Sequence, residues 1–395
     1  MTRPFGAPFG APAAERVVRA LVVDDSASVR ARIVEVLEAD PGVEVVGVAS
    51  DGQTAITMCE QLRPDVVTMD MVLPGVTGLA ATEYLMEHCP TPILVLSSAE
   101  NRGELISTAA ALAAGAVDVL DKPDGSVPME EWERKLLEAV KLVARIKVIT
   151  HLGLRDPRHH PRPRVPAQGS AAGLDPALPG PGSGPGRLDG LAVVGIGAST
   201  GGPGAVAAVL AALPRPFPVP VLITLHVNAA FVESLTDWLR TATGHDVRIA
   251  HGGEVLAGPS ARGLVLVAPA DKHLVVHRGR SMLTHTPPRQ SCRPSVDELF
   301  ESLATEYGPH TAACLLTGMG RDGAAGLLAI RRAGGATVAQ DEETSVVYGM
   351  PREAVLRGAA RYVLPVERVG AALASFAGLN LTGPPAAARP GEEVR

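Results

Sequence analysis

Aromatic residues are scarce in this sequence. They make up 3% of its 395 residues, whereas 46% of the residues are hydrophobic. Hydrophobic cores must therefore be built from alanine, valine, leucine and isoleucine, as is common in layered α/β proteins. Because the chain is too long for one typical core, we expect two domains.

Cysteine is scarce as well, and the four cysteines are widely spaced with no C-x-x-C pattern. This spacing argues against a zinc site and against a disulfide framework. We therefore expect four reduced thiols in the core or at the surface, which are Cys59, Cys89, Cys292 and Cys314.

Long apolar segments and an excess of positive charge are both absent. The longest apolar stretches, such as residues 219–225, are far shorter than the ~18 residues of a membrane span. The N-terminal segment has no continuous apolar stretch of the kind found in secretory signals. The net charge is −6, so the chain has no excess of positive charge with which to bind nucleic acid. We expect a cytoplasmic protein with no nucleic-acid partner and no direct membrane insertion.

Short apolar runs alternate with helical patterns in two parts of the chain, and this alternation is typical of doubly wound parallel sheets. The runs of the first part are VRALVVDD, VEVVGVA, PDVVTMD, TPILVLSS and AVDVLDKP. Those of the second part are LAVVGIGA, VPVLITLH, RGLVLVAP, TAACLLTG and ATVAQD. We therefore expect two doubly wound α/β domains, the first with five parallel strands and the second with a predominantly parallel sheet.

A stretch rich in proline and glycine separates the two parts and has no apolar period, which is typical of a flexible linker. Both ends of the chain also lack a strand or helix pattern. The expected boundaries are a disordered lead-in over 1–16, the first domain over 17–144, the linker over 145–188, the second domain over 189–381 and a disordered tail over 382–395.

Polar residues follow the strand-like runs of the first part. Asp24 and Asp25 close the first run, and Asp70 closes the third. Because function collects at the carboxyl edge of a parallel sheet, these carboxylates can converge there, and Mg²⁺ is the cation expected to hold them. Ser97 and Lys122 add a hydroxyl and a cation at the same edge. Any one of these acids alone could instead cap a helix or lie in a solvated loop.

Four segments of this part, VVDDS, MDMVLPGVTG, LSS and DKP, together resemble the receiver domain of two-component response regulators over about residues 18–135. The resemblance implies that Asp70 is the phosphoacceptor. It also implies that Asp24 and Asp25, together with Asp70, hold Mg²⁺, and that Ser97 and Lys122 contact the phosphoryl oxygens.

The second part begins with a strand, a glycine-rich turn and an alanine-rich helix. Residues 197–201 satisfy G-x-S-x-G with Ser199 at the centre. This spacing suits a turn that exposes a nucleophilic serine at a helix N-terminus, where unpaired N–H groups can stabilise an oxyanion. Two other interpretations remain open. The glycines could bind a dinucleotide, although their spacing is G-x-G-x-x-x-G and the next strand ends in His226 rather than an acid, or the serine could be a plain helix cap.

A serine nucleophile needs a base, and the base needs an acid to orient it. His226 ends the strand after Ser199, and Asp322 follows a later strand in the turn LLTGMGRDGAAGL. All three residues are expected at the same edge of the sheet, although a lone histidine at a strand end is more often structural. The order Ser, His, Asp differs from the Ser, Asp, His order of α/β-hydrolases.

Six segments of the second part resemble the catalytic domain of the chemotaxis protein-glutamate methylesterase, also a protein-glutamine deamidase, over about residues 189–378. They are GIGASTGGPGA, ITLHVNAAF, LVAPADKHL, SCRPSVDELF, LLTGMGRDGAAGL and GMPREAV. The resemblance implies an α/β hydrolase-type domain that acts without a cofactor on glutamate γ-methyl esters or glutamines of a chemoreceptor signalling domain. It also implies a chemotaxis histidine kinase as phosphodonor.

Regulation is expected to pass from the first domain to the second. The resemblance implies that the unphosphorylated receiver covers the hydrolase cleft. Val119 stands where many receivers carry an aromatic switch residue, and the long linker lowers the effective concentration of a docked receiver. A receiver-linked adaptor that binds a receptor without turnover is the alternative function.

Overall fold

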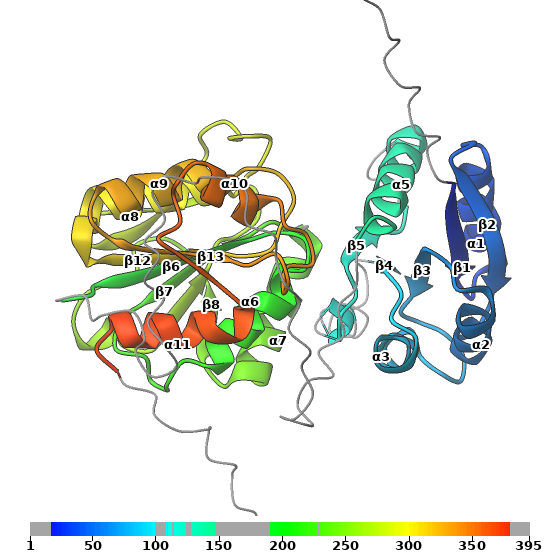
Figure 1. The fold of residues 1–395 in the computed structure, drawn as a ribbon, viewed down its shortest axis with the longest axis horizontal. Coiled ribbons are helices and arrows are strands. Elements are labelled where there is room, and N and C mark those ends of the chain that lie inside the picture. Colours follow the sequence, from blue (N-terminus) through cyan, green and yellow to red (C-terminus); the bar gives the residue numbers. More distant parts are fainter. Residues whose placement is uncertain are drawn as a thin grey trace, which may run out of the picture. The chain divides into compact units, whose positions relative to one another are not determined.

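The structure is a computed structural model, and it describes residues 17–98, 108, 110–112, 114–123, 128–146, 190–227 and 229–379. The chain divides into two compact units, Met1–Leu152 and Gly153–Arg395 (Figure 1). The expected lead-in, the expected tail and almost all of the expected linker lie outside the described residues. No helix within the described residues is both long and apolar enough to cross a membrane.

The first unit contains a five-stranded sheet in the order β2-β1-β3-β4-β5, in which every pairing is parallel. The strands are β1 (Val18–Val23), β2 (Val43–Ala49), β3 (Val66–Asp70), β4 (Ile93–Ser97) and β5 (Asp118–Asp121). The helices with described bounds are α1 (Ala27–Glu38), α2 (Gly52–Leu62), α3 (Gly78–His88) and α5 (Met129–Val143). All five strands expected from the apolar runs are therefore confirmed.

The second unit contains a seven-stranded sheet in the order β14-β13-β12-β6-β7-β9-β8, again with every pairing parallel. Its strands are β6 (Val193–Ala198), β7 (Val221–Leu225), β8 (Asp246–Ile249), β9 (Leu264–Val267), β12 (Thr311–Leu315), β13 (Ala336–Gln340) and β14 (Tyr362–Leu364). A separate antiparallel pair is formed by β10 (His273–His277) and β11 (Arg280–Thr284). The expectation of a predominantly parallel sheet is confirmed.

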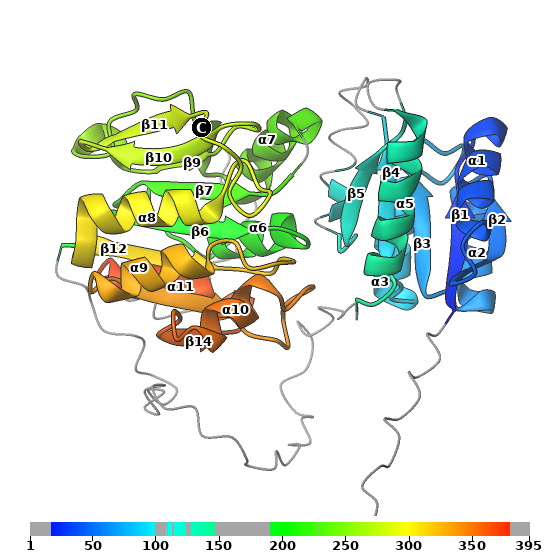
Figure 2. The ribbon, with the colours of Figure 1, turned by 90° about the horizontal axis from the view of Figure 1, so that it is seen from above.

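Helices cover both faces of this second sheet (Figure 1). On one face, α6 (Gly202–Ala211), α7 (Val232–Thr243) and α11 (Val366–Phe376) bury their apolar sides. On the other face, α8 (Val296–Tyr307), α9 (Ala324–Arg332) and α10 (Met350–Leu356) do the same. The pair β10–β11 packs beside α8, as Figure 2 shows. Two hydrophobic layers therefore hold β6, β7 and β12 rigidly at the centre of the sheet.

Four strands of the second unit were not anticipated from its sequence. Both β8 and β14 have at most four residues and lie at the edges of the sheet. Short edge strands carry little apolar pattern, because only one side of each can pair and their side chains are partly exposed. The pair β10–β11 is antiparallel and lies outside the main sheet, so the alternation of strands and helices does not reveal it.

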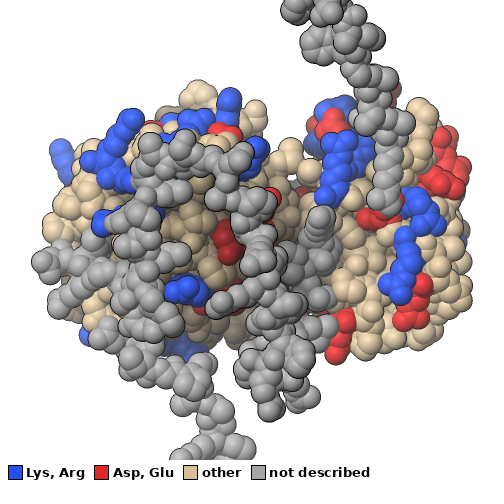
Figure 3. All heavy atoms as spheres, in the orientation of Figure 1, with Lys and Arg blue, Asp and Glu red and all other residues tan. Residues whose placement is uncertain are grey.

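Surface charge is mixed rather than segregated. Figure 3 shows lysine or arginine and aspartate or glutamate side chains on the same face of each unit. Exposed ion pairs follow helical spacing, such as Arg134 with Glu138 at 3.2 Å and Arg240 with Asp237 at 3.0 Å. Such pairs contribute about 0–1 kcal/mol each, so burial of the three hydrophobic clusters contributes more to stability than these pairs do.

Candidate active site

The three residues predicted to carry hydrolysis lie at the carboxyl ends of neighbouring strands. Ser199 follows β6, His226 follows β7, and Asp322 lies in the loop after β12. Strand β6 pairs with β7 on one side and with β12 on the other. Backbone hydrogen bonds fix this arrangement, because Ser199 N donates to Thr317 O at 3.0 Å and His226 N donates to Ala198 O at 3.1 Å.

Two glycines allow the chain to pack tightly around Ser199. Gly201 has a φ of +74°, and a Cβ added there would lie 2.5 Å from Val346 Cβ. A Cβ added at Gly318 would lie 2.7 Å from Ser199 Cβ. Among the described residues, the N–H groups of Thr200 and Gly201 have no hydrogen-bond acceptor. The turn before α6 therefore presents free donors beside the serine, as an oxyanion site requires.

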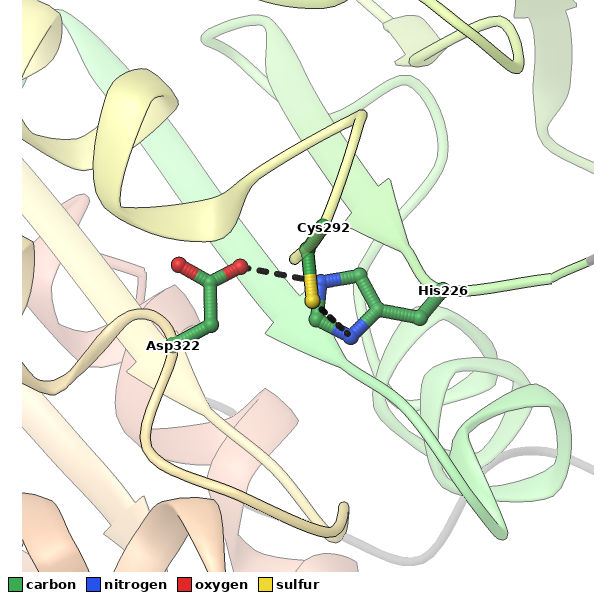
Figure 4. Close-up of side chains that lie close together, drawn as sticks. All are labelled: His226, Cys292 and Asp322. Carbon is green, nitrogen blue, oxygen red and sulfur yellow. Dashed lines mark hydrogen bonds and ion pairs between the residues drawn. The ribbon is translucent and has the colours of Figure 1, made fainter. Parts of the chain in front are cut away.

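The buried carboxylate of Asp322 is held at the N-terminus of α8. Its Oδ2 accepts from His226 Nε2 at 2.9 Å and from Val296 N at 2.7 Å (Figure 4). Its Oδ1 accepts from Ser295 Oγ at 2.7 Å and from the N–H groups of Asp297 and Gly323. Burial by itself would raise the pKa of this carboxyl, but the hydrogen bonds outweigh burial and hold the pKa below its usual range. The residue is therefore an anion at neutral pH.

His226 contacts two side chains. Its Nε2 faces Asp322, and its Nδ1 lies 3.8 Å from Cys292 Sγ, which Figure 4 shows in front of the ring. Burial works against protonation, but the hydrogen bonds with Asp322 and Cys292 outweigh it and raise the pKa of His226 to about 9. Because Nε2 donates to the carboxylate, Nδ1 is the nitrogen whose lone pair can act as a base in the neutral ring.

The structure thus brings His226 and Asp322 into contact and places Ser199 at the same sheet edge. Among the described residues, no hydrogen bond joins the Ser199 hydroxyl to His226, so the catalytic roles of the three residues remain a prediction. Cys292 was not predicted at this site, because its spacing from the other cysteines matches no motif. The only sequence signal is its position within SCRPSVDELF, one of the segments that resemble the methylesterase family.

The predicted phosphorylation site lies at the carboxyl edge of the first sheet. Lys122 Nζ lies 2.9 Å from Asp70 Oδ2 and 3.0 Å from Asp24 Oδ2. One carboxylate oxygen from each of Asp24, Asp25 and Asp70 lies within 4.8 Å of the others. Ser97, the last residue of β4, is buried and its Oγ accepts from Thr108 Oγ1 at 2.9 Å.

Burial and charge at this edge favour a bound cation. Burial raises the pKa of Asp70, the lysine opposes this effect, and the neighbouring Asp24 adds to it. Burial would lower the pKa of Lys122, but the two carboxylates outweigh it and raise that pKa. Asp24 Oδ2 and Asp70 Oδ2 are buried and accept no hydrogen bond from the described residues apart from their ion pairs with Lys122. Three convergent carboxylates with free oxygen lone pairs fit a hard divalent cation such as Mg²⁺.

Comparison with known proteins identifies both units. The family described as CheB methylesterase matches residues 194–373, and the response regulator receiver domain matches residues 20–130. A protein-glutamate methylesterase/protein-glutamine glutaminase 2 from Anaeromyxobacter dehalogenans (strain 2CP-C) is 42% identical over 91% of this chain and 97% of its own length. The protein-glutamate methylesterase/protein-glutamine glutaminase 4 of Geobacter metallireducens (strain ATCC 53774 / DSM 7210 / GS-15) is 43% identical over 91% and 99%.

A solved structure is also similar to the second unit. The crystal structure of the Thermotoga maritima CheB methylesterase catalytic domain is 34% identical, with a TM-score of 0.43, and the match covers 47% of this chain and 96% of that one. The identity to full-length relatives extends across both units. The chain therefore belongs to the protein-glutamate methylesterase/protein-glutamine glutaminase family, with a response regulator receiver domain ahead of a CheB methylesterase domain.

Proposed function

We propose that this protein hydrolyses glutamate γ-methyl esters and glutamine γ-amides on the signalling domain of a chemoreceptor, and that phosphorylation of its receiver regulates this activity. The observation that carries the proposal is the hydrogen bond between His226 and the buried Asp322 at the sheet edge that bears Ser199. A histidine oriented by a carboxylate, at the sheet edge that carries a partly exposed serine, is the arrangement that acyl transfer requires.

In the proposed reaction the Ser199 hydroxyl attacks the γ-carbonyl carbon, and His226 Nδ1 takes the hydroxyl proton. The N–H groups of Thr200 and Gly201 stabilise the oxyanion that forms. The imidazolium then donates its proton to the leaving group, which departs as methanol from an ester or ammonia from an amide. Water hydrolyses the acyl-enzyme by the same route and restores the serine. Asp322 keeps the proton on Nε2 and stabilises the imidazolium, so the hydrolysis needs no cofactor.

The receiver is proposed to take a phosphoryl group on Asp70 from a chemotaxis histidine kinase. Asp24, Asp25 and Asp70 would hold Mg²⁺, which neutralises negative charge during phosphoryl transfer. Lys122 and Ser97 would contact the phosphoryl oxygens. We assign residues 17–144 to the receiver domain, 145–188 to the linker and 189–381 to the catalytic domain.

Release of methanol tests whether the protein is an enzyme or an adaptor. Membranes that contain receptors with radiolabelled methyl esters, incubated with the purified chain, should lose label as volatile methanol. Receptors that carry glutamine at the same positions should release ammonia. Binding to the receptor without either product would favour the adaptor and contradict the proposed hydrolase.

Removal of Mg²⁺ should abolish the stimulation of hydrolysis by phosphorylation and leave basal hydrolysis in place. Acetyl phosphate, a small phosphodonor, should raise the rate of methanol release in the presence of Mg²⁺ and have no effect with excess EDTA, because the three carboxylates repel a phosphoryl group unless a cation is bound. The basal rate should not be lowered by EDTA, since hydrolysis uses no metal. An Asp70→Asn variant serves as the control, and acetyl phosphate should not raise its rate of methanol release. Equal stimulation of that variant would contradict Asp70 as the phosphoacceptor.

A further inference from the structure

Cys292 forms a cluster with the two residues of the proposed catalytic pair. One ligand atom from each of His226, Cys292 and Asp322 lies within 4.8 Å of the others. Figure 4 shows the sulfur in front of the imidazole ring and the carboxylate beside the Nε2 end of the ring. The hydrolytic mechanism uses the serine, the imidazole and the carboxylate, and it gives the thiol no role.

The distance between sulfur and nitrogen matches an edge of a zinc tetrahedron. Zn²⁺ binds thiolate sulfur at about 2.3 Å and imidazole nitrogen at about 2.0–2.1 Å, which separates the two ligands by about 3.6 Å at the tetrahedral angle. Cys292 Sγ and His226 Nδ1 are 3.8 Å apart. The spacing of the two atoms therefore suits a shared ion.

The other nitrogen of the His226 ring, Nε2, makes the hydrogen bond that is usual in a zinc-binding histidine. A histidine that binds a metal through one nitrogen usually donates the N–H of the other to a carboxylate, which fixes the tautomer and strengthens the ligand. His226 Nε2 lies 2.9 Å from Asp322 Oδ2, and the aspartate is held by the N-terminus of α8. The pair that orients the proposed catalytic base therefore also leaves Nδ1 as the nitrogen that can bind a cation.

A turn closed by backbone hydrogen bonds positions the thiol of Cys292. Cys292 N donates to Arg289 O at 2.9 Å, and Arg289 N donates to Cys292 O at 3.1 Å. The guanidinium of Arg289 forms two hydrogen bonds of 2.6 Å with Glu301 on α8. Gln290, within the turn, donates to Asp297 Oδ2 at 2.7 Å. Because these bonds tie the turn to the rigid helix that also holds Asp322, sulfur and imidazole are held at a fixed spacing.

The site is partly exposed, and within the described part of the chain no strong bond competes for the thiol. Cys292 and His226 are both partly exposed. The thiol lies 3.5 Å from the carbonyl oxygen of Gln290, a weak bond that a metal would replace. The absence of a C-x-x-C motif predicted no zinc site, but that prediction considers ligands close in sequence, whereas these two residues come together only in the fold.

We propose that Cys292 Sγ and His226 Nδ1 bind a thiophilic divalent cation such as Zn²⁺, completed by water, and that the bound ion reversibly inhibits hydrolysis. The metal occupies the lone pair that would accept the proton of Ser199, so the serine loses its base. Binding releases the thiol proton, and the Nδ1 proton when the ring is charged, to solvent. The inhibition rests on the proposed function, whereas metal binding itself does not.

Inhibition is tested on the full chain after dialysis against EDTA. Micromolar Zn²⁺ should inhibit methanol release, and EDTA should restore it. In a Cys292→Ser variant, compared with its own metal-free rate, the Zn²⁺ concentration for half-inhibition should rise at least ~10-fold. The matched control is Cys89→Ser, which removes a buried thiol of the receiver unit and should respond to zinc as the unmodified chain does. Equal zinc sensitivity of Cys292→Ser would overturn the proposal.

A second measurement does not depend on turnover. Co²⁺ bound to a thiolate gives a near-ultraviolet charge-transfer band, so Co²⁺ added to the full chain should produce this band. The band should persist in the inactive Ser199→Ala variant and disappear in Cys292→Ser. Its absence from both the unmodified chain and Ser199→Ala would overturn the metal site even if hydrolysis is established. Conversely, the band would remain a valid test of the site if no hydrolysis were found.

Discussion

Replacing Ser199 with alanine is expected to lower the rate of methanol release by about 10⁴-fold or more. The variant keeps the sheet edge, the histidine and the oxyanion donors but has no atom that can form the acyl-enzyme. The rate is measured with methylated receptor membranes under conditions where the unmodified protein is saturated. Phosphate incorporation at Asp70 should be unchanged, because that residue lies in the other unit.

The control for this experiment is Ser260→Ala, which removes an exposed hydroxyl from the same unit. It should retain the rate of the unmodified protein. Substantial esterase activity in Ser199→Ala would show that another residue is the nucleophile. Loss of activity in both variants would point to damage from the substitution itself and not to the chemistry of Ser199.

An Asp322→Asn substitution should have the second-largest effect, a loss of about 10³- to 10⁴-fold in kcat/KM. The amide can present its NH₂ group to His226, which selects the wrong tautomer. The carboxylate also accepts hydrogen bonds from Ser295 and from the first backbone N–H groups of α8. Leaving one of these buried donors unpaired should lower the free energy of unfolding by about 1–3 kcal/mol, which denaturant titration can measure.

The pH profile separates loss of catalysis from loss of stability. In the unmodified protein kcat/KM should rise about tenfold per pH unit up to the His226 pKa of about 9, since Nδ1 must be deprotonated to act as a base. The carboxylate raises this pKa. In the Asp322→Asn variant, the rise of kcat/KM with pH should therefore occur at lower pH. The exposed Asp246 provides a control, and Asp246→Asn should keep both the rate and the profile. An unshifted rise in Asp322→Asn would mean that another group is the base.

The positions of the proposed catalytic residues could be predicted because a parallel sheet brings strand ends together. Ser199, His226 and Asp322 are far apart in sequence, yet each follows a strand, and β7 and β12 both pair with β6. The same reasoning placed Asp24 and Asp70 beside Lys122, where the structure has two ion pairs. Strand ends are therefore informative even without knowledge of the strand order.

Cys292 could not be placed by that reasoning, because it does not follow a strand of the main sheet. Its position depends on a turn in which Gln290 and Ser291 adopt positive φ angles of 50° and 65°. It depends as well on the ion pair between Arg289 and Glu301, which joins the turn to α8. Neither feature leaves a periodic pattern, and non-glycine residues rarely adopt positive φ.

The pairing of β6 with both β7 and β12 also governs when the enzyme can first become active during its synthesis. The serine strand begins at Val193, whereas β12 begins at Thr311, more than a hundred residues later. At about 5–20 residues per second, a ribosome needs roughly 6 to 24 s to make the intervening chain. Until β12 emerges and pairs, Asp322 has no place beside His226, so a nascent chain that already displays Ser199 would lack the oriented base that the proposed reaction needs.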